Sequence, residues 1–77
     1  MIKDLYQRLY EDVMLQAQEH KVSRGKVIKV FIEAYEEHKQ VHGSFKHSSK
    51  YQEDMSARYH FMHQKAIQYI KSAEGIK

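Results

Sequence analysis

The chain has 77 residues, of which 42% are hydrophobic and 30% are charged, and its formal net charge is +3. This composition is typical of a folded domain with a thin core, because a chain this short hides only about 60% of its unfolded surface. The absence of cysteine excludes disulfide bonds, thiolate zinc sites and a cysteine nucleophile. The absence of proline, with only three glycines, favours a few long helices. We therefore treat residues 1–77 as a single small helical domain.

The first predicted helix covers residues 2–20. From Ile2 to Ala17, apolar side chains recur at spacings of three and four, which places them on one face of a helix. Polar and charged residues fill the other face. The pattern stops at residues 20–22, and Ser23 is a good N-cap for a second helix.

The second predicted helix covers residues 23–42 and ends before Gly43, because helices often end with a left-handed residue that glycine adopts most easily. Its apolar face is wide, which predicts a central helix that packs against both others. The face consists of Val27, Val30, Phe31, Ala34, Tyr35, His38 and Val41. Since His38 lies on this face, we expect it to be a hydrogen-bonded core histidine.

The third predicted helix covers residues 50–73, with Ser48 or Ser49 as its N-cap. Its apolar residues alternate between spacings of four and three, which predicts a short heptad seam. The seam consists of Met55, Tyr59, Met62, Ala66, Tyr69 and Ala73. Three helices with short connections predict an all-α three-helix bundle, and its thin core favours a homodimer.

A basic turn lies between the first two helices. In the segment from Ala17 to Val30, the apolar residues of both helices flank the sequence Val-Ser-Arg, and no acidic residue occurs between Lys21 and Lys29. The segment resembles the bihelical unit of helix-turn-helix DNA-binding proteins. The resemblance implies a small transcriptional regulator of the phage or mobile-element type that binds double-stranded DNA. The residues expected to contact DNA are Lys21, Ser23, Arg24, Lys26 and Lys29, and Lys46 and Lys50 are expected to contact the DNA backbone.

The same turn also resembles the helical half of ribbon-helix-helix repressors, which read DNA with an N-terminal β-strand. Here Ile2 and Leu5 continue the helical period, so the sequence predicts no such strand. We therefore rank this resemblance second.

The aromatic content favours a different hypothesis, a non-enzymatic module that binds a host protein as an adaptor or an inhibitor. Six tyrosines and three phenylalanines are many for so small a core, and these residue types are enriched at interfaces. The expected interface consists of Phe45, Tyr59, Phe61 and Met62. The two hypotheses differ in where the cations lie. Convergence of the basic residues on one face favours DNA, whereas scatter favours the interaction module.

No pattern predicts catalysis, a cofactor or a metal site. His38 and His42, like His60 and His63, are spaced as zinc ligands can be, but no pattern supplies the further ligands. A bundle this thin is also expected to lack a pocket of roughly 300 Å³. Because no apolar run approaches roughly 18 residues and no secretory signal is visible, we expect a cytoplasmic protein without a membrane partner.

Overall fold

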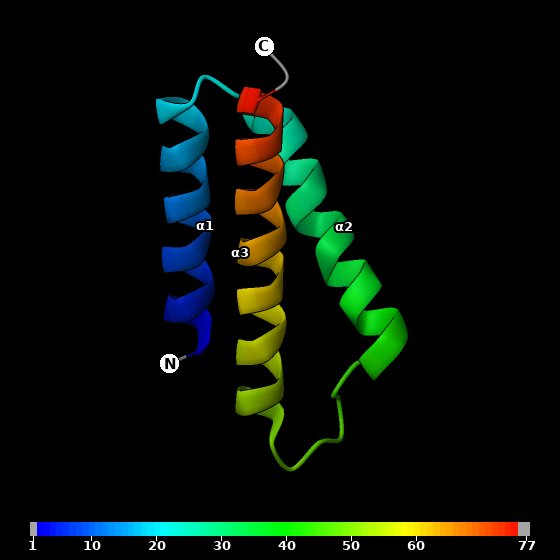
Figure 1. The fold of residues 1–77 in the computed structure, drawn as a ribbon. Coiled ribbons are helices and arrows are strands. Elements are labelled where there is room, and N and C mark those ends of the chain that lie inside the picture. The colour runs from blue at the N-terminus through cyan, green and yellow to red at the C-terminus, as the bar shows by residue number, and fades with distance from the viewer. Residues whose placement is uncertain (1, 76–77) are drawn as a thin grey trace.

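The computed structural model describes residues 2–75, which form three α-helices (Figure 1). Helix α1 covers Ile2–Glu19, α2 covers Arg24–His42 and α3 covers Tyr51–Gly75. These bounds confirm the predicted all-α three-helix bundle. The described residues contain no β-strand, so the N-terminal ribbon of a ribbon-helix-helix protein is absent from them.

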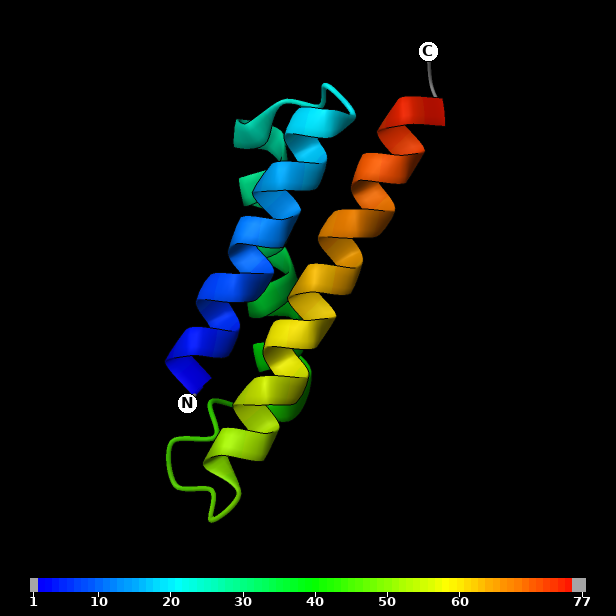
Figure 2. The same ribbon diagram turned by 90° about the vertical axis from the view of Figure 1, so that its left-hand side faces the viewer.

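Helix α3 lies at the centre of the bundle. Both α1 and α2 pack mainly against α3, and they contact each other less. Helices α1 and α3 run in the same direction, and α2 runs in the opposite direction (Figures 1 and 2). Toward the start of α1 and the end of α2, these two helices diverge (Figure 1). The prediction that the second helix is central was therefore wrong.

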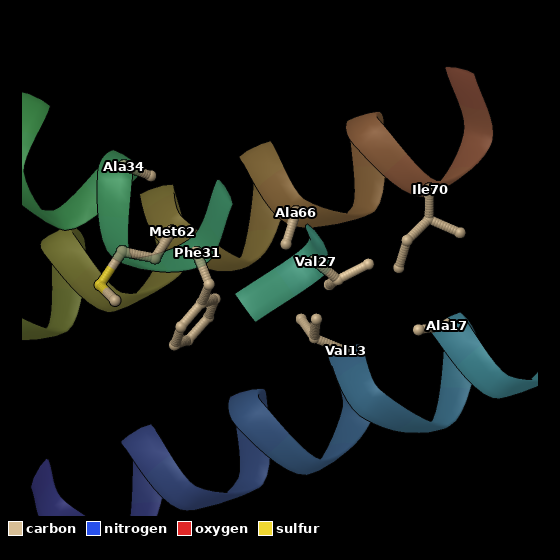
Figure 3. Close-up of a cluster of buried hydrophobic side chains, with 8 residues drawn as sticks. All are labelled: Val13, Ala17, Val27, Phe31, Ala34, Met62, Ala66 and Ile70. Atoms are coloured by element: carbon tan, nitrogen blue, oxygen red, sulfur yellow. The ribbon is translucent and has the colours of Figure 1, made fainter. Parts of the chain in front are cut away.

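The core is built mainly from small and medium side chains. Phe31 is its only aromatic residue that is nearly fully buried. The core cluster consists of Val13, Ala17, Val27, Phe31, Ala34, Met62, Ala66 and Ile70 (Figure 3). Because alanine occurs on all three helices at this cluster, the backbones can approach closely, and removal of one large side chain leaves little to fill its space.

The buried face of α3 differs from the predicted heptad seam. Met55, Met62 and Ala66 are buried as expected, but Tyr59 and Tyr69 are only half-buried. Their expected places are taken by Arg58 and Ile70, which are fully buried. A heptad seam assumes 3.5 residues per turn, whereas a helix in a short bundle keeps 3.6, so the buried face here continues through spacings of four.

Helix α1 ends in a hydrogen-bonded Schellman motif. The Val22 amide donates to the Ala17 carbonyl over 2.9 Å, and the Lys21 amide donates to the Gln18 carbonyl over 3.2 Å. This motif requires a left-handed residue, and Lys21 takes that conformation with φ of 57°. The motif turns the chain sharply, so that α2 starts beside the end of α1.

The predicted end residues of α2 occupy the expected positions, but the predicted N-cap of α3 at Ser48 or Ser49 was wrong, because α3 starts at Tyr51 and the Lys50 carbonyl accepts its first helical bond, from the Asp54 amide. Gly43 follows α2 with φ of 84°, a value that favours glycine, and its amide donates to the Lys39 carbonyl over 2.7 Å. The Ser48 hydroxyl accepts from the Lys50 amide over 3.1 Å and donates to Asp54 over 2.7 Å, so it fixes the entry into α3. Ser23 precedes α2, but its hydroxyl makes no cap hydrogen bond.

Candidate functional site

One end of the bundle is basic. We define the basic end as Lys21, Arg24, Lys26 and Lys29, which lie at the α1–α2 turn and in the first two turns of α2. All four side chains are exposed, and within residues 2–75 none takes part in an ion pair or a side-chain hydrogen bond. Ser23 is also exposed, and its hydroxyl leaves the first amides of α2 uncapped. The basic end therefore combines free cations with an open helix N-terminus, which suits a phosphate group.

The other two predicted DNA contacts lie elsewhere. Lys46 and Lys50 belong to the α2–α3 loop, residues 43–50, at the opposite end of a bundle that is 45 Å long (Figure 1). The six predicted cations are thus divided between the two ends and do not converge on one face. By the criterion stated above, this scatter favours the interaction module over a DNA-binding face that uses all six.

The four predicted interface residues do not form a free surface. Met62 belongs to the core and is 2% exposed. Phe61 is half-buried, with its ring 5.2 Å from that of His38, and Tyr59 is half-buried against the ring of Tyr6 at 5.0 Å. Phe45 packs over the side chain of Arg58. Met62, Phe61 and Tyr59 mainly hold the bundle together, whereas Phe45 covers Arg58 from the loop.

Aromatic residues gather at the end of the bundle that lies opposite the basic end. We define the aromatic end as Tyr6, Tyr35, Val41, Phe45, Tyr51 and Tyr59. Tyr6, Val41 and Tyr51 are 38%, 74% and 43% exposed, so apolar surface is open to solvent there. Burial, together with the nearby phenols of Tyr51, Tyr35 and Tyr6, raises the pKa of Tyr59 above its ordinary value. The Tyr59 hydroxyl therefore stays neutral at physiological pH.

Arg58 lies beneath the aromatic end and is fully buried. Its Nε donates a hydrogen bond to Nδ1 of His38 over 3.0 Å, and one terminal nitrogen, Nη2, donates to the Gly43 carbonyl. Its guanidinium carbon lies 4.2 Å from the ring centre of Phe45 and 5.2 Å from that of Tyr35. The burial of Arg58 was not predicted from the sequence, because arginine side chains are mostly exposed to solvent.

The positive charge of Arg58 has no carboxylate partner among the described residues. An imidazole, a main-chain carbonyl and two aromatic faces surround the guanidinium. The second terminal nitrogen, Nη1, is buried and has no hydrogen-bond partner. Arginine cannot lose its charge in a protein, and buried charges are normally paired. The site is therefore a buried cation that is solvated only by weak, mostly neutral groups.

His38 is the hydrogen-bonded histidine that the sequence predicts. Its Nδ1 accepts from Arg58, so this nitrogen carries no proton. Its ring lies 4.3 Å from His42 and also contacts Phe45 and Phe61. Burial lowers the pKa of His38 below its ordinary value of 6.5, and the positive charges of His42 and Arg58 lower it further. His38 is consequently neutral in the folded chain near pH 7.

We expect the free energy of unfolding to fall as the pH decreases below 6.5. Because the pKa of His38 is lower in the folded chain, the unfolded chain binds more protons in this range, so acid favours unfolding. Urea unfolding midpoints measured from pH 5 to pH 8 should show this slope. His38→Gln keeps a hydrogen-bond acceptor but does not titrate, so it should reduce the dependence of the urea midpoint on pH. His60→Gln changes an exposed histidine and should leave this dependence unchanged. Equal slopes for wild type and His38→Gln would contradict the prediction.

The α2–α3 loop closes over Arg58 through Phe45. Phe45 has φ of 64°, a left-handed conformation that is strained for a bulky residue. The hydrogen bonds of the loop are mostly local, such as that from the Ser48 amide to the Phe45 carbonyl over 3.0 Å. One hydrogen bond joins the loop to α3 beyond the first turn of that helix. In this bond, the Gly43 carbonyl accepts from the Arg58 side chain. The Arg58 side chain therefore links this loop to the bundle.

Neither predicted histidine pair forms a metal site within residues 2–75, where no three His, Asp or Glu side chains lie close enough to share an ion. His63 instead contacts Asp12 across α1 and α3, with 2.7 Å between Nε2 and Oδ2. Contrary to expectation, a hollow of about 510 Å³ is present at Ser49–Glu53. Five consecutive residues line it, so it gathers no catalytic groups from separate elements.

Comparison of the chain with known protein families, curated proteins and solved structures finds no match. Among the described residues, none of the helices combines the length and the apolar character that crossing a bilayer requires. The candidate sites are therefore judged on their own geometry, namely the basic end and the aromatic end with Arg58 beneath it.

Proposed function

We propose that the protein is a non-enzymatic protein-interaction module that binds its partner through the aromatic end. The single observation behind this proposal is the composition of that end, where Tyr6, Val41 and Tyr51 are exposed and the buried Arg58 lies against the rings of Tyr35 and Phe45. Tyrosine and arginine dominate the energetically important centres of protein interfaces, because both offer large contact areas with polar atoms. The division of the cations between the two ends supports the same choice.

A pair of matched variants tests this function. Val41→Ser with Tyr51→Ser changes two exposed side chains at the aromatic end, so folding should be unaffected. Lys26→Glu with Lys29→Glu changes two exposed side chains at the basic end. A protein that co-purifies with the full chain and the second variant, but not with the first, would support the proposal. Loss of that protein only with the second variant would contradict it.

Self-association is a separate outcome of the same experiment. Sedimentation of the full chain and of both variants would show whether two copies pair through the aromatic end. A dimer that the Val41→Ser, Tyr51→Ser variant dissociates would make a second copy the partner. The predicted homodimer stays a prediction until then.

A second candidate function is binding to duplex DNA through the basic end. The open N-terminus of α2 beside four unpaired cations favours it. Four cations neutralise about four phosphates, so the logarithm of the affinity should fall by about 3.6 per log unit of salt. Lys26→Glu with Lys29→Glu should abolish binding, whereas Lys46→Glu with Lys50→Glu, at the far end, should leave most of it. Absence of binding at about 50 mM salt would exclude this candidate.

A further inference from the structure

The environment of Arg58 is suited to an anion that the described residues do not supply. Its guanidinium is fully buried, and the Nη1 nitrogen has no partner. The Nε bond is accepted by a second basic side chain, His38, whose ring centre lies 4.3 Å from that of His42. An anion placed at Nη1 would pair the buried charge and satisfy the free donors at once.

The geometry favours a carboxylate over a phosphate. The Nε and Nη2 nitrogens already bond His38 and Gly43, so the free donors lie at the Nη1 side of the guanidinium. A carboxylate needs two parallel donors at most, and its single charge balances that of one arginine. A phosphate has up to two charges and more acceptor oxygens, which would be costly to remove from water between the rings of Phe45 and Tyr35.

Phe45 is the loop side chain that covers the guanidinium. Its ring covers the guanidinium at 4.2 Å, and its left-handed backbone is strained. Displacement of Phe45 releases this strain and exposes the guanidinium, and it need not disturb the core cluster, to which Phe45 does not belong. The loop therefore holds an aromatic ring on the cation, and this ring is not part of the core cluster.

We propose that Arg58 is a binding site for a carboxylate of the partner protein, closed by Phe45 when the partner is absent. The inference rests on the proposed protein-binding function for the identity of its occupant. The occupant is an Asp or Glu side chain, or a chain-terminal carboxylate, that displaces the Phe45 ring and pairs with the guanidinium.

The test uses Phe45→Ala and two small probes that differ only in charge. Benzoate supplies both a ring in place of Phe45 and a charged carboxylate, whereas benzamide supplies the same ring with a neutral amide. We expect Phe45→Ala to bind benzoate at least about ten-fold more tightly than benzamide, because only the carboxylate forms a charge-assisted pair. The wild-type chain should bind benzoate more weakly than Phe45→Ala, because its own ring must leave. Heteronuclear NMR titration at constant ionic strength measures both affinities.

Two further measurements make the outcome specific to Arg58. At equal concentrations, the Arg58 Nε resonance of Phe45→Ala should shift more with benzoate than with benzamide. Adding Arg58→Met to Phe45→Ala should remove the preference for benzoate, whereas adding Lys46→Gln, on the exposed loop, should preserve it. Equal affinities for the two probes, or a preference that survives without Arg58, would overturn the proposal. Either result would leave the protein-binding function open, since the Val41 and Tyr51 variants test that function without the probes.

Discussion

Replacement of Phe31 by alanine is expected to lower the free energy of unfolding by about 3–5 kcal/mol. Phe31 is 1% exposed, and its ring lies 5.9 Å from the rings of both Tyr6 and Tyr10. It thus helps to join α2 to α1, the two helices that contact each other least. The surrounding core residues are mostly alanine and valine, which cannot expand into the cavity.

Urea unfolding followed by circular dichroism at 222 nm measures this loss. A domain of this length has a free energy of unfolding of about 4–12 kcal/mol. If the wild type lies near the lower end of this range, at least about half of the Phe31→Ala molecules should be unfolded without urea. Ile32→Ala is the matched control, because Ile32 is the next residue and is 53% exposed. The control should cost less than about 1 kcal/mol. If both variants lost equal stability, the assignment of the core would be wrong.

The helices themselves were predictable because each has a local signal. The period of the apolar residues located all three, and Gly43 marked the end of α2, where its φ of 84° requires a residue without a side chain. The end of α1 has no such signal, since Lys21 occupies the left-handed position there. It was still found, because the apolar period stops at the same place.

The central position of α3 was not predictable from the width of an apolar face. The face of α2 extends from Val27 to Val41, but Val41 is 74% exposed, because α2 diverges from the bundle at that end (Figure 1). Divergence depends on how three helices cross, and no local pattern encodes the crossing. The length of α2 was informative, however. Its 19 residues span about 28 Å, which already separates the basic turn from Lys46 and Lys50.

The site beneath the aromatic end was missed because its parts come from three separate elements. Arg58 belongs to α3, its hydrogen-bond acceptors belong to α2 and the loop, and Phe45 covers it from the loop. The one local signal was an arginine on the line that joins Met55 to Met62, where a strict heptad pattern places Tyr59 instead. A buried arginine becomes credible only when its acceptors are known, and those are 15 and 20 residues away in the sequence.

Two replacements of Arg58 are expected to separate the effect of its side-chain volume on the free energy of unfolding from the effect of its charge. Arg58→Ala should lower the free energy of unfolding by about 2–4 kcal/mol, because it leaves a cavity and removes the bonds to His38 and Gly43. Arg58→Met keeps most of the volume, contacts the Phe45 ring through its sulfur, and removes an unpaired buried charge. It should therefore lie within about 1 kcal/mol of the wild type.

Urea unfolding at pH 7.5, where His38 is neutral in both states, compares the two variants without a contribution from titration. Arg58→Lys is a useful third variant, since it keeps the charge but loses the planar group that bonds His38 and Gly43 together. It should be less stable than Arg58→Met, because a buried ammonium ion is left with fewer partners. If Arg58→Met were as unstable as Arg58→Ala, the two hydrogen bonds would outweigh the cost of the buried charge. Arg58 would then be a purely structural link between the loop and the bundle, with no need of an anion.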